Sequence, residues 1–327
     1  MAVSRASVWQ LDPANYQRHA LHGESRTWVE KNCYIDVWLE VLHAAKLEPT
    51  AILPFTLASD FDGDQWTFYK PPHVELNALY GVSVQELNVW KTILEHAVFH
   101  TAQGRLIFTE ADAFWLPDTQ GTDYRSQHTK STIVIETIDV EARKLGYFHN
   151  AGYFELGGED FVNLFRLNAA PDPTFMPLFA ELVKVDRAVR LPEPELAARS
   201  SGLLRPWLER RPSSNPVRRL GQHFAANLEL IRSHGIGYYH AWAFANTRQC
   251  GSGYELTAEY LRWLDRHSAR GYAAIATSFD AISNSAKALI LKGARAASSK
   301  KPVDFEPIFE EMAQHWDAAM SALDAIA

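Results

Sequence analysis

The chain has 327 residues, of which 47% are hydrophobic and 22% charged, and its formal net charge is −7. This composition is typical of a globular protein with one large or two ordinary domains, and it lacks the basic footprint of a nucleic-acid-binding surface. Residues 1–13 have no apolar core of signal-peptide length, and no run approaches the roughly 18 apolar residues of a membrane span. The two cysteines, Cys33 and Cys250, allow no disulfide framework. We therefore expect a cytoplasmic protein that binds neither nucleic acid nor membrane.

The first periodic element covers residues 34–45. Apolar or small residues at 34, 37, 38, 41, 42 and 45 follow one face of a helix. Asn32 is a suitable N-cap, because its side-chain oxygen can accept an unpaired backbone N–H. Cys33 then lies in the first turn, where unpaired N–H groups and the helix dipole favour a thiolate. This position suits either a catalytic nucleophile or a small buried hydrophobic side chain.

An acidic segment follows this helix. Asp60, Asp62 and Asp64 have the spacing that opens an EF-hand calcium loop. However, the glycine falls between the second and third acids, and the twelfth position is Pro71 rather than a bidentate Glu. We interpret the segment as a solvated turn before a strand, and we expect no metal site.

The rest of the chain divides into a mixed half and a helical half. In the first half, the pattern predicts a strand at 65–70, a helix at 84–103, a strand at 105–112, and a hairpin of strands 131–139 and 145–150. After a Pro-rich linker at 169–177, it predicts helices at 178–188, 195–210, 216–233, 237–247, 253–269, 271–292 and 304–325. We expect an α+β domain over residues 1–170 and an all-α domain over residues 171–327.

A catalytic thiol needs a base, and the base needs an acceptor that orients it. His128 lies where a loop enters a predicted strand, and Asn150 ends the returning strand. A symmetric hairpin would leave His128 about five residues, or about 16 Å, from the position opposite Asn150, so a bulge or bend is required. His149 is a rival base, although strand alternation points it to the opposite face from Asn150.

Several motifs resemble those of a bacterial domain-of-unknown-function family (1839), over nearly the whole chain. They are residues 30–36, 60–70, 116–119 and 145–153. That family is distantly similar to the butirosin biosynthesis protein H group of papain-like C39 acyltransferases, which has a papain-like N-terminal half and a helical C-terminal half. The resemblance implies a papain-like cysteine-protease fold for the first domain, with Cys33 as nucleophile, His128 as base and Asn150 as orienting residue. It also implies acyl transfer from a carrier-protein thioester to an amine.

The residues expected to bind substrate are Asn32, Gln65 and Arg248. Papain-type enzymes have a Gln a few residues before the cysteine, whereas this chain has residues 26–28, Arg-Thr-Trp, there. Asn32 or Gln65 could supply the missing oxyanion donor. Arg248 lies in a polar segment expected to interrupt two helices, where it either satisfies helix-end carbonyls or binds a phosphate or carboxylate of the acyl donor.

Three further charged residues, Lys70, Asp112 and Asp118, either line the mouth of a cleft or are simply solvated. The sequence lacks the Gly-x-Ser-x-Gly nucleophile elbow of many serine hydrolases. It contains neither a Gly-x-Gly-x-x-Gly motif nor a P-loop.

These patterns predict a thiol-dependent acyltransferase. It moves an acyl or aminoacyl group from a carrier-protein thioester to a small-molecule amine through a Cys33 acyl-enzyme. No metal or cofactor is expected, apart from the phosphopantetheine arm of the carrier protein as donor. The alternatives are a C39-like peptidase or amidase, and a non-catalytic binding module on the same fold.

Overall fold

The computed structural model describes residues 5–170, 172, 174–299 and 303–326, and its contacts form two compact units. The sheet unit comprises residues 1–22, 33–47 and 72–190, and the helical unit comprises residues 23–32, 48–71 and 191–327. The boundary expected at residue 170 falls before a strand of the sheet unit, and residues 171 and 173 of the expected linker lie outside the described residues.

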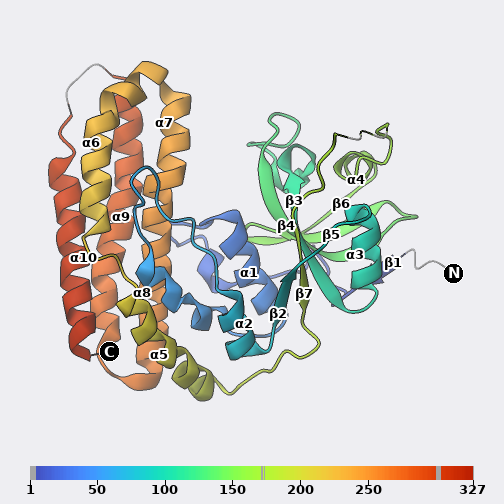
Figure 1. Ribbon diagram of the computed structural model, residues 1–327, viewed down its shortest axis with the longest axis horizontal. Helices are drawn as coiled ribbons and strands as arrows, with labels where there is room; N and C mark the ends of the chain where they lie inside the picture. Colours follow the sequence, from blue (N-terminus) through green and yellow to red (C-terminus); the bar gives the residue numbers. More distant parts are fainter. Residues whose placement is uncertain (1–4, 171, 173, 300–302, 327) are drawn as a thin grey trace. The chain divides into compact units, whose positions relative to one another are not determined.

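The sheet unit contains a seven-stranded antiparallel sheet in the order β2-β7-β3-β4-β5-β6, with β1 also paired to β4 (Figure 1). Its strands are β1 (Arg5–Ser7), β2 (Ser83–Glu86), β3 (Arg105–Asp112), β4 (Lys130–Asp139), β5 (Lys144–His149), β6 (Gly152–Gly157) and β7 (Ala180–Lys184). The strands expected at 105–112, 131–139 and 145–150 are therefore confirmed as β3, β4 and β5.

Helices cover both faces of this sheet. They are α1 (Cys33–Ala44), α2 (His73–Tyr80), α3 (Ile93–Thr101) and α4 (Glu159–Leu164), with 3-10 turns η1 (Ala20–His22), η3 (Ala113–Trp115) and η4 (Pro117–Thr119). On one face, Trp38 of α1 stacks on Phe108 of β3 at 4.5 Å between ring centroids. On the other, Ala97 of α3 and Phe161 of α4 join the apolar cluster around Ile133. The first half of the chain is thus α+β, as the sequence predicts.

One helix expected from periodicity is a strand instead, and another is helical only in its second half. The segment expected to be helical at 178–188 contains β7, and the segment expected at 84–103 begins with β2, which pairs with β7. Helix α3 begins only after Thr92, which forms a capping box with Glu95. Pairing between strands distant in sequence therefore overrides the local helical pattern.

The hairpin of β4 and β5 carries a bulge. Its register pairs Ile133 with His149 and shifts between Ile135 and Thr137. Glu136, the bulged residue, is fully buried, and its carboxylate accepts hydrogen bonds from the hydroxyls of Ser7 (2.9 Å) and Tyr153 (2.7 Å). A buried carboxylate needs such donors, so the bulge is held in place.

The helical unit is built from long helices that run side by side (Figure 1). They are α5 (Glu193–Glu209), α6 (Pro216–His234), α7 (Ile236–Ala243), α8 (Gln249–Ser268), α9 (Tyr272–Ala297) and α10 (Glu306–Ile326), with η2 (Pro49–Ala58) packed on α5 and α8. The expected break before α8 is wrong, because the π-helical turn η5 (Phe244–Arg248) joins α7 to α8 without interruption. The strand expected at 65–70 is also absent, and only an isolated bridge joins Phe61 to Trp66.

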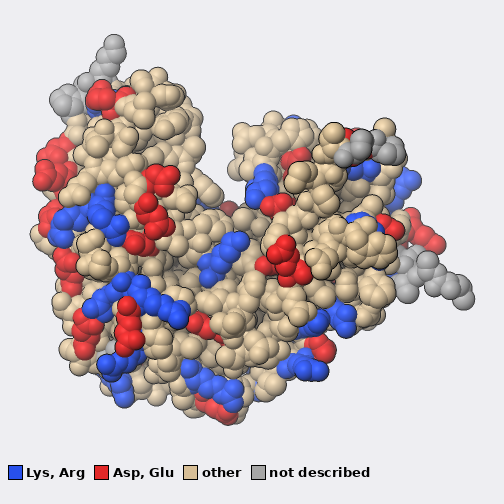
Figure 2. All heavy atoms as spheres, in the orientation of Figure 1, with Lys and Arg blue, Asp and Glu red and all other residues tan. Residues whose placement is uncertain are grey.

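Charges of both signs are interspersed on the face of the helical unit drawn in Figure 2. Arg211 pairs with Asp324 and Arg218 with Glu310, so basic side chains on this unit lie beside acidic ones. Within the described residues, no helix is both long and apolar enough to cross a membrane.

Candidate functional site

Cys33 is the first residue of α1 and is half-buried. Its Sγ lies 3.7 Å from Oγ1 of Thr132, near the start of β4. Thr132 is the cross-strand partner of Glu110 on β3, so the two side chains share the face of the sheet that α1 covers. The thiol therefore lies between a helix N-terminus and the polar end of two strands.

Lys130 and Glu110 share the sheet face of Thr132, which contacts the thiol. The Lys130 ammonium is 2.8 Å from the Glu110 carboxylate, and the Lys130 side chain is mostly exposed. The hydrogen bond to Glu110 raises the pKa of Lys130, against a small opposing effect of burial, and the charges of Glu110 and Cys33 add to the increase. Lys130 is consequently a stable cation within electrostatic reach of Cys33.

The structure does not bring Cys33, His128 and Asn150 together. His128 is 69% exposed, its Nδ1 lies 2.6 Å from Oδ2 of Asp112, and its ring stacks on Phe114. Asn150 has a positive φ of 43° in the turn after β5. The β4–β5 register places Asn150 opposite Thr132, four residues or about 13 Å along the strand from His128. Among the described residues, no hydrogen bond joins any two of the three.

The rival base His149 belongs to a different group, on the opposite face of β4. Its Nε2 lies 2.6 Å from Oγ of Ser131, and its Nδ1 lies 2.6 Å from Oδ2 of Asp118. The hydroxyl of Tyr147 donates to the other oxygen of Asp118 at 2.5 Å. The His149 side chain is 1% exposed and that of Asp118 is 4% exposed. Sequence reasoning singled out His149 and Asp118 but missed Ser131, which strand alternation places on the same face as Ile133, the partner of His149.

The three expected substrate-binding residues all lie in the helical unit. Asn32 donates its side-chain amide to the carbonyl of Tyr69 at 3.2 Å, and Gln65 is exposed in a turn. Arg248 donates to the carbonyls of Glu30 (3.1 Å) and Lys31 (3.2 Å). Arg248 therefore holds the segment that precedes Cys33, whereas substrate contacts by these residues stay a prediction.

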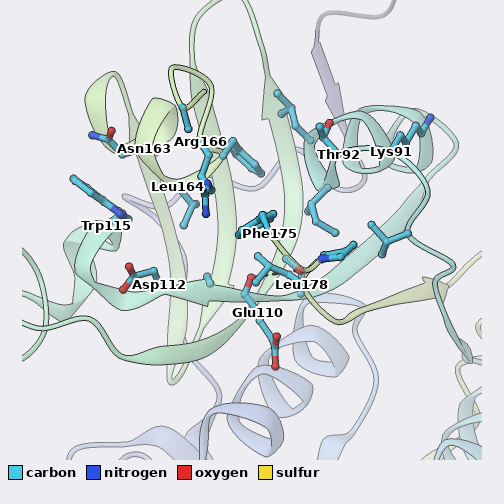
Figure 3. A pocket seen from close by; sticks show the side chains of 18 of the residues that line it. Lys91, Thr92, Glu110, Asp112, Trp115, Asn163, Leu164, Arg166, Phe175 and Leu178 are labelled. Carbon is cyan, nitrogen blue, oxygen red and sulfur yellow. Dashed lines mark hydrogen bonds between the residues drawn. The ribbon is translucent and has the colours of Figure 1, made fainter. Parts of the chain in front are cut away.

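A cavity of about 930 Å³ opens in the sheet unit on the face opposite α1 (Figure 3). Its lining is mainly apolar and includes Ile93, Leu94, Ile133, Leu164, Phe165 and Phe175. Asp112 and Trp115 lie together on one side of it, while Glu110 points away from the other labelled side chains. A cavity of this size and composition is typical of a site for a small hydrophobic ligand.

The described residues offer no cluster that could bind a metal ion. No group of three or more His, Cys, Asp or Glu side chains is arranged there to hold a metal ion. Asp60, the first acid of the apparent calcium loop, instead forms an ion pair with Arg219.

The molecule is thus an α+β protein in which a cysteine opens a helix on an antiparallel sheet, with a helical C-terminal region. The chain belongs to the DUF1839 family, because the DUF1839 N-terminal domain matches residues 17–185 and the DUF1839 C-terminal domain matches residues 193–325. This match confirms the resemblance to the domain-of-unknown-function family 1839. No curated protein matches the sequence significantly.

Proposed function

We propose that this protein is a cysteine acyltransferase that moves an acyl or aminoacyl group from a carrier-protein thioester to an amine. The observation that carries the proposal is the position of the Cys33 thiol at the first residue of α1, 3.7 Å from the Thr132 hydroxyl and beside Lys130. A helix N-terminus presents unpaired backbone N–H groups, and a nearby cation adds positive charge; nucleophilic cysteines are found in such electropositive surroundings.

A papain-like arrangement of the sheet unit is part of this proposal. Helix α1 begins with the cysteine and packs on β4, β5 and β6, on one face of an antiparallel sheet. A cysteine at the start of a helix that faces a sheet is the layout that the butirosin-related resemblance implies. In this proposal, Lys130 and Glu110 take the roles that the sequence assigned to His128 and Asn150.

The proposed acyl transfer uses the Cys33 sulfur as nucleophile and the charges of Lys130 and Glu110. The Cys33 sulfur attacks the thioester carbonyl, a new S–C bond forms, and the bond to the pantetheine sulfur breaks. The proton of the Cys33 thiol passes through Glu110 to the departing pantetheine sulfur, so that pantetheine leaves as a thiol. The acceptor amine then attacks the acyl-enzyme, and Glu110 can accept its proton while the Cys33 sulfur leaves. Lys130 is placed to balance negative charge on the carbonyl oxygen in both steps.

The test is to incubate the full chain with an acylated carrier protein and to measure the mass added to Cys33. Cys33→Ala should remove the adduct and the turnover, while Cys250→Ala, at the other cysteine, should leave both unchanged. Lys130→Ala should slow acylation by about tenfold to a hundredfold. Lys144→Ala is a matched control, because Lys144 forms an ion pair of the same length with Glu155 on the same sheet. No adduct on wild type, or equal turnover by Cys33→Ala, would refute the proposal.

The same Cys, Lys and Glu side chains also suit hydrolysis, with water in place of the amine. A C39-like peptidase or amidase would cleave peptides or amides without any carrier protein. A non-catalytic binding module would leave Cys33 no more reactive toward iodoacetamide at pH 6 than a cysteine in a short peptide.

A further inference from the structure

We propose that Ser131, His149 and Asp118 form a second catalytic site, in which Ser131 is the nucleophile of an esterase that acts on hydrophobic acyl groups. The site is separate from that of Cys33. Ser131 and Thr132 are neighbours on β4, so their side chains point to opposite faces of the sheet. Thr132 contacts Cys33, whereas Ser131 contacts His149.

The hydrogen bonds meet the geometric requirements of a serine, histidine and aspartate relay. The nucleophile–base distance and the base–acid distance are both 2.6 Å. A serine and a carboxylate are thus joined through the two ring nitrogens of one histidine. Such a relay is recognised by geometry and by the roles of its members rather than by their order in the sequence.

The surroundings of Asp118 fix the tautomer of His149. Burial and the adjacent Asp118 carboxylate raise the pKa of Tyr147, so its hydroxyl stays protonated and donates to Oδ1 of Asp118. Oδ2 of Asp118 then accepts a hydrogen bond from Nδ1–H of His149. This leaves the lone pair of Nε2 facing the Ser131 hydroxyl, which is the arrangement that a general base requires.

The cavity lies on the same face as Ser131. Ala111 is the cross-strand partner of Ser131, Ile133 follows it by two residues, and both line the cavity. Ser131 itself is half-buried. Ser131 thus lies beside two residues of the cavity lining without being part of the lining itself. This adjacency to an apolar cavity is why we assign a hydrophobic ester as the substrate class.

The reaction balances without any additional reagent except water. Nε2 of His149 takes the Ser131 proton as the Ser131 oxygen bonds to the ester carbonyl carbon. The carbon–oxygen bond to the alcohol breaks, and His149 returns the proton to the leaving alkoxide. Water then attacks the acyl-serine, its proton passes through His149 to the serine oxygen, and a carboxylic acid is released.

The first test is to treat the folded, full-length protein with a fluorophosphonate probe and to locate the adduct by peptide mass spectrometry. The adduct should lie on Ser131 and should be lost in His149→Gln. Ser126→Ala is a matched control, because Ser126 is exposed and its hydroxyl donates to the Thr122 carbonyl rather than to a histidine. The position of the adduct separates this site from the thiol site, since a failure at Cys33 leaves labelling of Ser131 unaffected.

The second test is hydrolysis of p-nitrophenyl esters of increasing acyl length. The apolar cavity predicts that kcat/KM rises by up to about fourfold for each added CH2 until the cavity is filled. Ser131→Ala should lower kcat/KM by at least about a hundredfold. An unlabelled Ser131 in the folded wild type, or wild-type hydrolysis by Ser131→Ala, would overturn the proposal. Labelling of the wild type needs no variant. An unlabelled Ser131 would therefore refute the proposal even if Ser131→Ala does not fold.

Discussion

Replacing His22 with alanine should destabilise the sheet unit by several kcal/mol. Nε2 of His22 lies 3.0 Å from Oδ1 of Asp36, and Nδ1 lies within hydrogen-bonding distance of Oε1 of Glu40. All three side chains are fully buried, and Asp36 and Glu40 are one turn apart on α1. Each ring nitrogen of His22 thus has a carboxylate partner, so the imidazole bridges the two buried acids.

The magnitude follows from what the substitution leaves behind. Removing one member of a buried ion pair costs about 3–5 kcal/mol, because the remaining charge stays buried without its partner. In His22→Ala two carboxylates lose the same partner, while Tyr16 still donates to Glu40 at 2.6 Å. We therefore expect a loss of about 3–5 kcal/mol in the free energy of unfolding at pH 7.

The assay is urea denaturation followed by circular dichroism, with hydrogen exchange of residues 33–44 as a local measure of α1. His43→Ala is the matched control, because His43 lies on the same helix and its imidazole donates to a backbone carbonyl, that of Gln17 at 3.1 Å, rather than to a buried carboxylate. We expect this control to lose about 1 kcal/mol or less. A loss for His22→Ala no larger than that for His43→Ala would show that the cluster contributes no net stability.

Acid should weaken the same cluster. Burial alone would raise the pKa of Glu40, but the hydrogen bonds and charge of His22, together with Tyr16, outweigh burial and lower the pKa below its ordinary value of 4.5. A lowered carboxylate pKa contributes stability above the unfolded value, and that stability is lost as pH falls through the folded value. The stability difference between wild type and Glu40→Gln should therefore be full at pH 7 and shrink below about pH 4.5. A difference that is constant from pH 7 to pH 3 would contradict this reasoning.

Two further predictions concern a glycine and a cysteine. Gly81 has a φ of +70°, and a Cβ there would lie 2.4 Å from the Arg187 carbonyl oxygen, whereas Gly104 has a φ of +72° and open space around it. Gly81→Ala should therefore cost about 2–5 kcal/mol and Gly104→Ala only about 1–2 kcal/mol in denaturant melts, and equal losses would exclude the clash. Burial raises the pKa of the Cys250 thiol, so native protein should be alkylated by iodoacetamide at Cys33 and not at Cys250, while both react in urea. If mass spectrometry showed both cysteines of the native protein alkylated at the same rate, the expected protection of Cys250 would be contradicted.

The elements that the sequence predicts correctly are those set by local signals. Most helices of the C-terminal half lie between Pro, Gly and Ser breaks, and β3, β4 and β5 follow their own alternation. By contrast, β2 and β7 form because they pair with each other across about a hundred residues, which no local pattern encodes. The capping box at Thr92 and Glu95 was a local signal that could have shortened the predicted helix.

The candidate site residues likewise divide into those that a local signal predicts and those that depend on strand pairing. The place of Cys33 at a helix start depends on its own neighbours, and the structure has α1 begin at this residue. The groups around it, Thr132, Lys130 and Glu110, come from two strands whose register cannot be obtained from single-strand periodicity. Ser131 was missed for the same reason, since its link to His149 exists only in one register of the hairpin.

That register depends on the bulge at Glu136. Ile135 and Ile138 are three residues apart, yet both belong to the apolar cluster on the face opposite α1, which is possible only if the bulge shifts the alternation by one. Without the shift, strand alternation from Ile138 would turn Thr132 toward the apolar cluster and Ser131 toward Cys33. The buried Glu136 carboxylate, held by donors from β1 and β6, therefore determines which side chain faces each site although it contacts neither thiol nor imidazole.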